Sequence, residues 1–190
     1  MTLSSLTAAA LAAALVAAAS VLAFSKFPAL FVWAAFIGWA SFDQSGATGQ
    51  AALRSSAALA FGAIIAWLVA IIVVIRWSSA SATLLTAIVA GIASFVIVTA
   101  SRVPSFRIVP AAFYRFASTF AYLGLSSGAF TIEALTSLSL RNAIFSVTLS
   151  LLVGTGLGIA HTSFASVLAS QRGWVRVSLS NAHVSKRVEA

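Results

Sequence analysis

The sequence contains no cysteine and only three acidic residues, and charged residues make up only 7% of it. Without cysteine there can be no disulfide framework, thiol nucleophile, zinc–thiolate site or iron–sulfur site. The phosphate-binding G-x-x-x-x-G-K-[ST] loop and the H-E-x-x-H metal motif are also missing. The sequence therefore predicts a protein that is not an enzyme and holds no metal and no cofactor.

Apolar residues are what the chain has in excess. They account for 61% of the sequence, against about 45–50% in soluble domains, and they recur in runs able to cross a hydrocarbon core about 30 Å thick. The net charge of +8 does not indicate a nucleic-acid partner, because the basic residues lie at the ends of apolar runs. We expect an all-α polytopic membrane protein in contact with the lipid bilayer.

Proline, glycine and charged residues divide the apolar sequence into segments, and we expect each segment to be a transmembrane helix. The six segments are residues 5–24, 29–42, 51–75, 80–100, 108–126 and 142–169. They form one domain, residues 1–169, followed by a basic tail at 170–190. The second segment is short, reaching only about 21 Å as a helix. We expect it to end inside the bilayer or to continue as irregular backbone from Asp43 to Gly46.

The basic residues predict the orientation of these six segments. One side of the predicted membrane carries eight basic residues and the other side carries three, Lys26, Arg76 and Arg141. Because basic residues favour the cytoplasmic side, both termini are expected in the cytoplasm. The tail at 170–190 is expected to lie against anionic lipid head groups, or to act only as a topology anchor.

The two halves of the chain, residues 5–75 and 80–169, resemble each other. The sequence Phe-x-x-aromatic-Ala-Ser occurs at 36–41 and again at 113–118. Further matches are Ser-Gly-Ala at 45–47 and 127–129, and a glycine at Gly62 and Gly154. Three helices in each half would give the halves opposite orientations, as in many channels and secondary transporters.

The same residues resemble a known family. The block from Trp33 to Gly38, the stretch 113–120 and the run Gly154-x-Gly156-x-Gly158 are similar to the YcdZ-like bacterial inner-membrane proteins, a family catalogued only as a domain of unknown function. Arg115 departs from the family pattern, which has a small residue there. The resemblance implies a small polytopic protein of the bacterial inner membrane and supplies no substrate and no site residues.

Three ionisable residues are candidates for a solute site, because charges inside a membrane are costly and are usually functional. They are Asp43, Arg115 and His161. Arg115 could bind an anionic or carbonyl-bearing solute or extend to the cytoplasmic surface. His161 could relay protons or line a pore, or be a neutral packing residue. Asp43 could pair with Arg115, or cap the third helix or sit in water.

Aromatic residues are expected to line the predicted site, and glycines are expected to pack the helices. We expect the three ionisable residues to share a cavity lined by Trp39, Phe42 and Phe116. Small residues allow close helix packing or leave room for a pore, and packing is expected at Gly62, Gly154, Gly156 and Gly158.

These features favour a channel or secondary transporter for an unidentified small solute. The alternative is a non-transporting scaffold or a subunit of a larger membrane complex, since glycine and aromatic faces can also hold partners. Assembly into a homo-oligomer is open at this stage.

Overall fold

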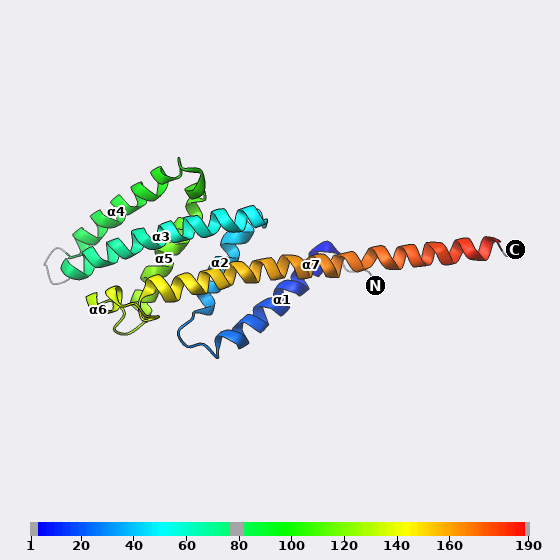
Figure 1. Cartoon of the computed structure of the whole chain (residues 1–190), viewed down its shortest axis with the longest axis horizontal. Helices are drawn as coiled ribbons and strands as arrows, with labels where there is room; N and C mark the ends of the chain where they lie inside the picture. The colour runs from blue at the N-terminus through cyan, green and yellow to red at the C-terminus, as the bar shows by residue number, and fades with distance from the viewer. Residues whose placement is uncertain (1–3, 77–81, 189–190) are drawn as a thin grey trace. The chain divides into compact units, whose positions relative to one another are not determined.

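The computed structural model describes residues 4–76 and 82–188 for the backbone and 4–76 and 83–169 for the side chains. All regular secondary structure in these residues is helical. The elements are α1 (Ser5–Phe24), α2 (Val32–Gln44), α3 (Gly49–Arg76), α4 (Ala82–Ala100), the 3-10 helix η1 (Pro104–Phe106), α5 (Val109–Leu125), α6 (Ile132–Thr136) and α7 (Ala143–Val188) (Figure 1). The predicted all-α class is confirmed.

Within the described residues, four stretches of helix are long and apolar enough to cross a membrane. They are Ser5–Phe24, Gly49–Arg76, Thr83–Ala100 and Ala143–Ala169. Large apolar side chains on these helices are exposed, among them Phe95 at 70%, as expected for helices whose solvent is lipid. The protein is a membrane protein. The other two predicted spans are helices as well, but α2 has 13 residues and α5 has 17, so length alone does not identify them as spans.

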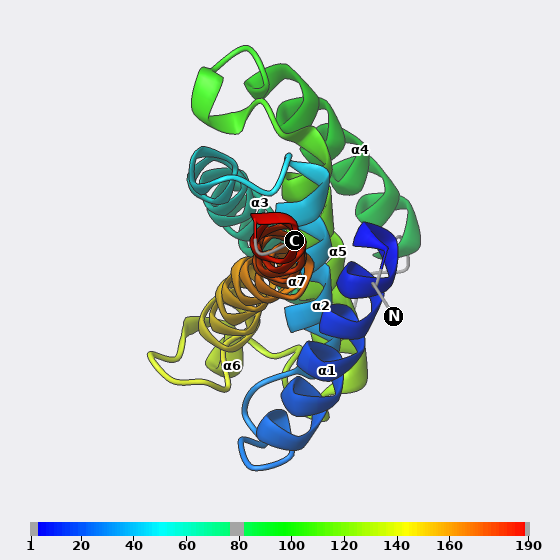
Figure 2. The same ribbon diagram turned by 90° about the vertical axis from the view of Figure 1, so that its right-hand side faces the viewer.

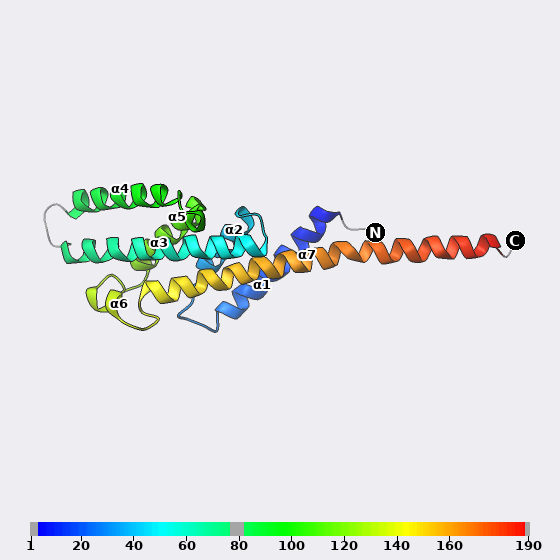
Figure 3. The same ribbon diagram turned by 45° about the horizontal axis from the view of Figure 1, so that its top comes forward.

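The chain divides into two compact units, residues 23–158 and residues 1–22 with 159–190. Within the first unit, α3 packs against both α5 and α4, and α3 and α4 run in opposite directions (Figure 3). The part of α7 in this unit also runs opposite to α3 (Figure 1). Figure 2 shows the same reversal between α2 and α5.

Glycines allow helix backbones to touch at three positions in the first unit. A β-carbon at Gly62 would lie 2.2 Å from the Ala112 carbonyl oxygen, and one at Gly154 would lie 1.8 Å from the Ala35 carbonyl oxygen. At Gly38 the corresponding distance to the Leu151 carbonyl oxygen is 2.0 Å. No side chain fits at such distances, so only glycine permits these contacts.

The other two predicted packing glycines differ from each other. A β-carbon at Gly158 would lie 2.6 Å from Cδ1 of Phe42 and 3.0 Å from Cδ1 of Trp39, so Gly158 does pack against α2. A β-carbon at Gly156 would meet none of the described residues within 4 Å. The expected packing role of Gly156 is therefore corrected, because alternate residues on a helix point to different sides.

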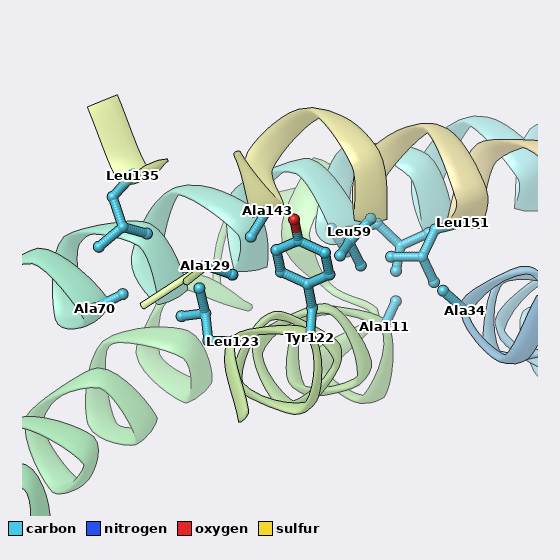
Figure 4. Packing of buried hydrophobic residues seen from close by; sticks show 12 residues of the cluster. Ala34, Leu59, Ala70, Ala111, Tyr122, Leu123, Ala129, Leu135, Ala143 and Leu151 are labelled. Atoms are coloured by element: carbon cyan, nitrogen blue, oxygen red, sulfur yellow. The ribbon is translucent and has the colours of Figure 1, made fainter. Parts of the chain in front are cut away.

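The largest apolar cluster of the first unit joins α2, α3, α5, α6 and α7, with Leu59, Tyr122 and Leu151 among its buried members. Tyr122 rises from α5 between Ala143 and Leu59 (Figure 4). Its hydroxyl donates a hydrogen bond of 2.9 Å to the Arg141 carbonyl oxygen. This bond ties the end of α5 to the start of α7.

The segment between α5 and α7, predicted as a loop, is folded against the bundle. Leu135 of α6 is completely buried, and its carbonyl oxygen accepts hydrogen bonds of 2.7 Å from Nε1 of Trp67 and 2.7 Å from Nδ2 of Asn142. Oδ1 of Asn142 in turn accepts from the Ile144 amide at 3.0 Å. These bonds fix where α7 begins.

α7 continues as one helix beyond residue 169, where the sixth predicted segment ends, to Val188. Residues 170–188 contain no proline that would stop the helix. The backbone of the predicted tail is therefore a direct extension of the last apolar helix. The expected contact of the tail with anionic lipid head groups depends on side chains outside the described residues.

Candidate functional site

Arg115 is the feature on which a candidate site can be built. It lies six residues after Val109, the first residue of α5, which is about 9 Å along the helix axis. The residue is 0% exposed and heads the largest fully buried side chains of the described residues. A buried guanidinium cannot lose its proton in practice, so the site contains a positive charge.

The guanidinium points toward the first turns of α7. Nη1 donates a hydrogen bond of 2.5 Å to Oγ1 of Thr119, one turn further along α5. Nη2 donates to the Ala143 carbonyl oxygen at 3.0 Å and to Oγ1 of Thr148 at 2.9 Å. Arg115 thus links α5 to α7 and has no exposed surface through which to extend to the membrane surface.

Thr119 and Thr148 can accept hydrogen bonds from Arg115 because their own hydroxyl hydrogens are already donated elsewhere. The Thr119 hydroxyl donates to the Arg115 carbonyl oxygen at 3.0 Å, and the Thr148 hydroxyl donates to the Ile144 carbonyl oxygen. Since a hydroxyl has one hydrogen and two lone pairs, each oxygen is left to accept from Arg115.

All partners of Arg115 among the described residues are neutral. Its Nε has no hydrogen-bond partner there, and neither has Oγ of Ser118, which is 1% exposed. A buried charge without a counter-ion is costly, and buried polar atoms without a hydrogen-bond partner are rare in folded proteins. The arrangement can bind a group that supplies oxygen acceptors, such as a carboxylate, phosphate or carbonyl.

An open cavity of about 420 Å³ lies beside this network. Apolar side chains make up most of its lining, including Leu149 and Leu152, and it also touches Ile144 and Thr148. Thr148 therefore faces both the cavity and the Arg115 guanidinium, which places the buried charge one side chain away from open space.

The predicted pairing of Asp43 with Arg115 is wrong, because the two residues lie far apart. It is exposed, near the end of α2, beside Phe42, which packs at Gly158. Gly158 is fifteen residues along α7 from Ala143, about 22 Å in an α-helix, and Arg115 bonds at Ala143.

The capping alternative for Asp43 is also corrected. Oγ1 of Thr48 accepts a 3.0 Å hydrogen bond from the Ala51 amide, so Thr48 caps α3. A cap must directly precede the first turn of the helix, and Asp43 lies too far before Gly49 for this role.

The aromatic residues predicted to line one cavity lie in two places. Trp39 and Phe42 pack against Gly158 of α7. Phe116 packs with the Val69 and Val73 cluster of α3 instead, and its ring lies 5.1 Å from that of Phe120. Neither position is at the Arg115 guanidinium.

His161 belongs to the second unit, where its Nε2 lies 3.2 Å from the Ala9 carbonyl oxygen of α1. The side chain is half-buried. The contact of a ring nitrogen with a backbone carbonyl oxygen agrees with the alternative that His161 is a packing residue. In the described residues no group of three or more His, Cys, Asp or Glu side chains could hold a metal ion.

Sequence reasoning missed the partners of Arg115. Thr119 follows Arg115 by four residues, a spacing that places both on one helix face, so this signal was available. Thr148 and the Ala143 carbonyl oxygen belong to another helix, and nothing in the sequence indicates that they meet Arg115.

A serine directly after the end of α5 lies within a sequence pattern known from hydrolases. Residues 124–128 read G-x-S-x-G, the pattern of a hydrolase nucleophile on a strand-to-helix turn. Here Ser126 follows the last residue of α5, and the chain continues from a helix, without a strand in the described residues. The geometry that exposes such a nucleophile is not present at this serine.

Comparison with known proteins gives a family and no function. No curated protein and no solved structure matches the chain. The resemblance to an uncharacterised family agrees with the match that was found, while the YcdZ-like name stays a prediction. The matching family is described as "Protein of unknown function (DUF1097)", its match covers residues 10–166, and the chain belongs to this family.

Proposed function

We propose that the protein is a channel or secondary transporter for a small solute, built from two inverted repeats of three spans. The observation that carries the proposal is a pair of matching backbone contacts. Aligning the motif at Phe36 with that at Phe113 places Ala35 on Ala112, and the glycine match places Gly62 on Gly154. In the structure Gly62 meets Ala112, and Gly154 meets Ala35.

The contact is therefore reciprocal. The second helix of each half packs on the third helix of the other half, at equivalent residues. Contacts in which residue i meets j and j meets i are what a two-fold axis produces. Because α2 and α5 run in opposite directions (Figure 2), and α3 and α7 do so too (Figure 1), the axis that we propose lies in the membrane plane.

This arrangement requires α2 and α5 to cross the membrane even though they are short. As helices they reach about 20 Å and about 26 Å, and the adjoining segments would cover the remaining thickness. Substrate sites of such proteins lie at the repeat interface, often on short or interrupted helices. We place both termini in the cytoplasm, following the excess of basic residues on one side. We place the protein in the bacterial inner membrane because of its resemblance to the YcdZ-like proteins.

Arg115 is a position at which the two proposed repeats differ. It aligns with Gly38 of the first half, which allows α2 to touch the Leu151 backbone. The second half places a buried cation there instead. We propose that this cation binds a solute carrying an anionic group or a carbonyl, and that the protein catalyses no reaction.

The test is uptake into proteoliposomes that contain only this protein. Acetate, phosphate, urea and methylammonium form a panel of two anions, a carbonyl compound and a cation. We expect saturable uptake of at least one acceptor-bearing solute and none of methylammonium. Uptake at the level of protein-free liposomes for the whole panel, with a partner protein retained at fixed stoichiometry during purification, would favour the scaffold instead.

A further inference from the structure

We infer that the protein has a second anion site, at the end of the bundle where α2 ends, α3 begins and η1 leads into α5. A cavity of about 360 Å³ lies there. Two arginines from distant parts of the sequence, Arg54 and Arg107, line it together with Gln44, Thr48 and Gln50. No acidic residue is among the described residues that line it.

The walls of this cavity are held by specific contacts. The rings of Phe61 and Phe106 stack with their centres 4.6 Å apart and their planes at 19°. This stack fixes η1, and with it the neighbouring Arg107, against α3. The Tyr114 hydroxyl donates a 2.8 Å hydrogen bond to Oε1 of Gln44 and thereby joins α5 to the end of α2.

The charges of the cavity are uncompensated. Arg54 and Arg107 are both exposed, and neither guanidinium makes a hydrogen bond or ion pair with another side chain of the part of the chain that the structure describes. Two like charges that share one cavity repel each other, and a bound anion removes this repulsion. Each guanidinium also offers a planar set of donors that matches phosphate or carboxylate oxygens.

The size of the cavity and its two guanidinium groups together indicate the class of ligand. Pockets for small molecules begin at about 300 Å³, so the cavity accommodates a phosphate group with a small substituent. Such a group is present both in free phosphorylated solutes and in anionic lipid head groups. The inference goes beyond the proposed function, because this cavity adjoins the start of α5, whereas Arg115 bonds at the start of α7.

The test uses the full chain in nanodiscs of phosphatidylcholine, with inorganic phosphate titrated by calorimetry. The variant carries Arg54→Gln and Arg107→Gln together. The matched control is Arg102→Gln. Arg102 is an exposed arginine in the connection between α4 and η1, and it does not line the cavity. We expect the double variant to bind phosphate at least about tenfold more weakly than the wild type and the control, even with screening of exposed charges.

A second arm separates the two sources of the ligand. Nanodiscs that contain phosphatidylglycerol are used, and native mass spectrometry counts the lipids that the protein retains. The site is assigned to a lipid head group if two results occur together. The double variant, but not Arg102→Gln, loses the retained phosphatidylglycerol, and the wild type does not bind phosphate. If neither phosphate binding nor lipid retention differs between the double variant and Arg102→Gln, the inference is overturned.

Discussion

Gly154→Ala is expected to destabilise the protein strongly, because the added β-carbon would lie 1.8 Å from the Ala35 carbonyl oxygen. A backbone oxygen within a packed helix cannot move aside without separating α2 from α7. Overpacking of this kind costs about 1–3 kcal/mol and occasionally more, and we expect the upper end of that range or beyond. Gly62→Ala, with 2.2 Å to the Ala112 carbonyl oxygen, is expected to have a similar effect.

The chain provides a control for this prediction on the same helix. Gly156 lies two residues from Gly154, and a β-carbon there would meet no atom within 4 Å in the part of the chain that the structure describes. Gly156→Ala is therefore expected to leave stability unchanged or slightly improved, since alanine is the better helix former. The measurement is thermal unfolding of the three purified variants in detergent. Equal stability of Gly154→Ala and Gly156→Ala would show that the α2–α7 contact is not as close as described.

Arg115→Met is expected to abolish solute uptake while making the protein more stable. Replacement of buried ion pairs by apolar side chains of similar volume is often neutral or stabilising by about 1–4 kcal/mol, because the cost of burying the charges is removed. We expect a gain of this kind here, since Arg115 has only neutral partners among the described residues to offset that cost. If the same charge binds the solute, its removal leaves no flux. A residue with a purely structural role would show the opposite pattern, with lower stability and retained flux in the remaining folded protein.

A second substitution separates the charge from its support. Thr119→Val keeps Arg115 but removes the acceptor of its 2.5 Å hydrogen bond, so we expect a loss of about 1–3 kcal/mol of stability. Ser118→Ala is the matched control, because Oγ of Ser118 has no hydrogen-bond partner in the described residues. Unfolding midpoints and uptake rates are measured for both variants beside Arg115→Met. Higher stability of Thr119→Val than of Ser118→Ala would contradict the network.

Much of the fold could be predicted because apolar runs and their interruptions are local signals. The predicted segment 5–24 is α1, and 108–126 is α5 within one residue at each end. The contact of Gly62 with α5 was anticipated only as a packing tendency, since the sequence does not say which helix approaches. α6 was missed, because its stability comes from Trp67 and Asn142, which bond to Leu135 from outside the segment.

The candidate site was less predictable for an electrostatic reason. A buried cation is expected to need an acidic partner, and Asp43 is the acid that the sequence offers as a possible partner of Arg115. In the structure Arg115 is held by hydroxyl and backbone oxygens. The four-residue spacing of Arg115 and Thr119 was a usable signal, but the hydroxyl and carbonyl groups of α7 occur everywhere in a sequence and give none. The cavity lined by Arg54 and Arg107 was missed because both arginines count, in the sequence, only among the eight basic residues that predict the orientation. Their proximity arises from the packing of η1 on α3.

The central claim is that two inverted repeats cross the membrane three times each, and it depends most on whether α5 crosses. The chain has no cysteine, so single cysteines can be introduced at Ser105, before α5, and at Ser139, after it, both exposed. Intact cells are treated with a membrane-impermeant maleimide, and each variant is labelled again after permeabilisation. We predict that Ser139→Cys reacts from outside and that Ser105→Cys reacts only after permeabilisation. Equal labelling of both cysteines from outside would place them on one side of the membrane, and would contradict the inverted repeat and the transport function proposed from it.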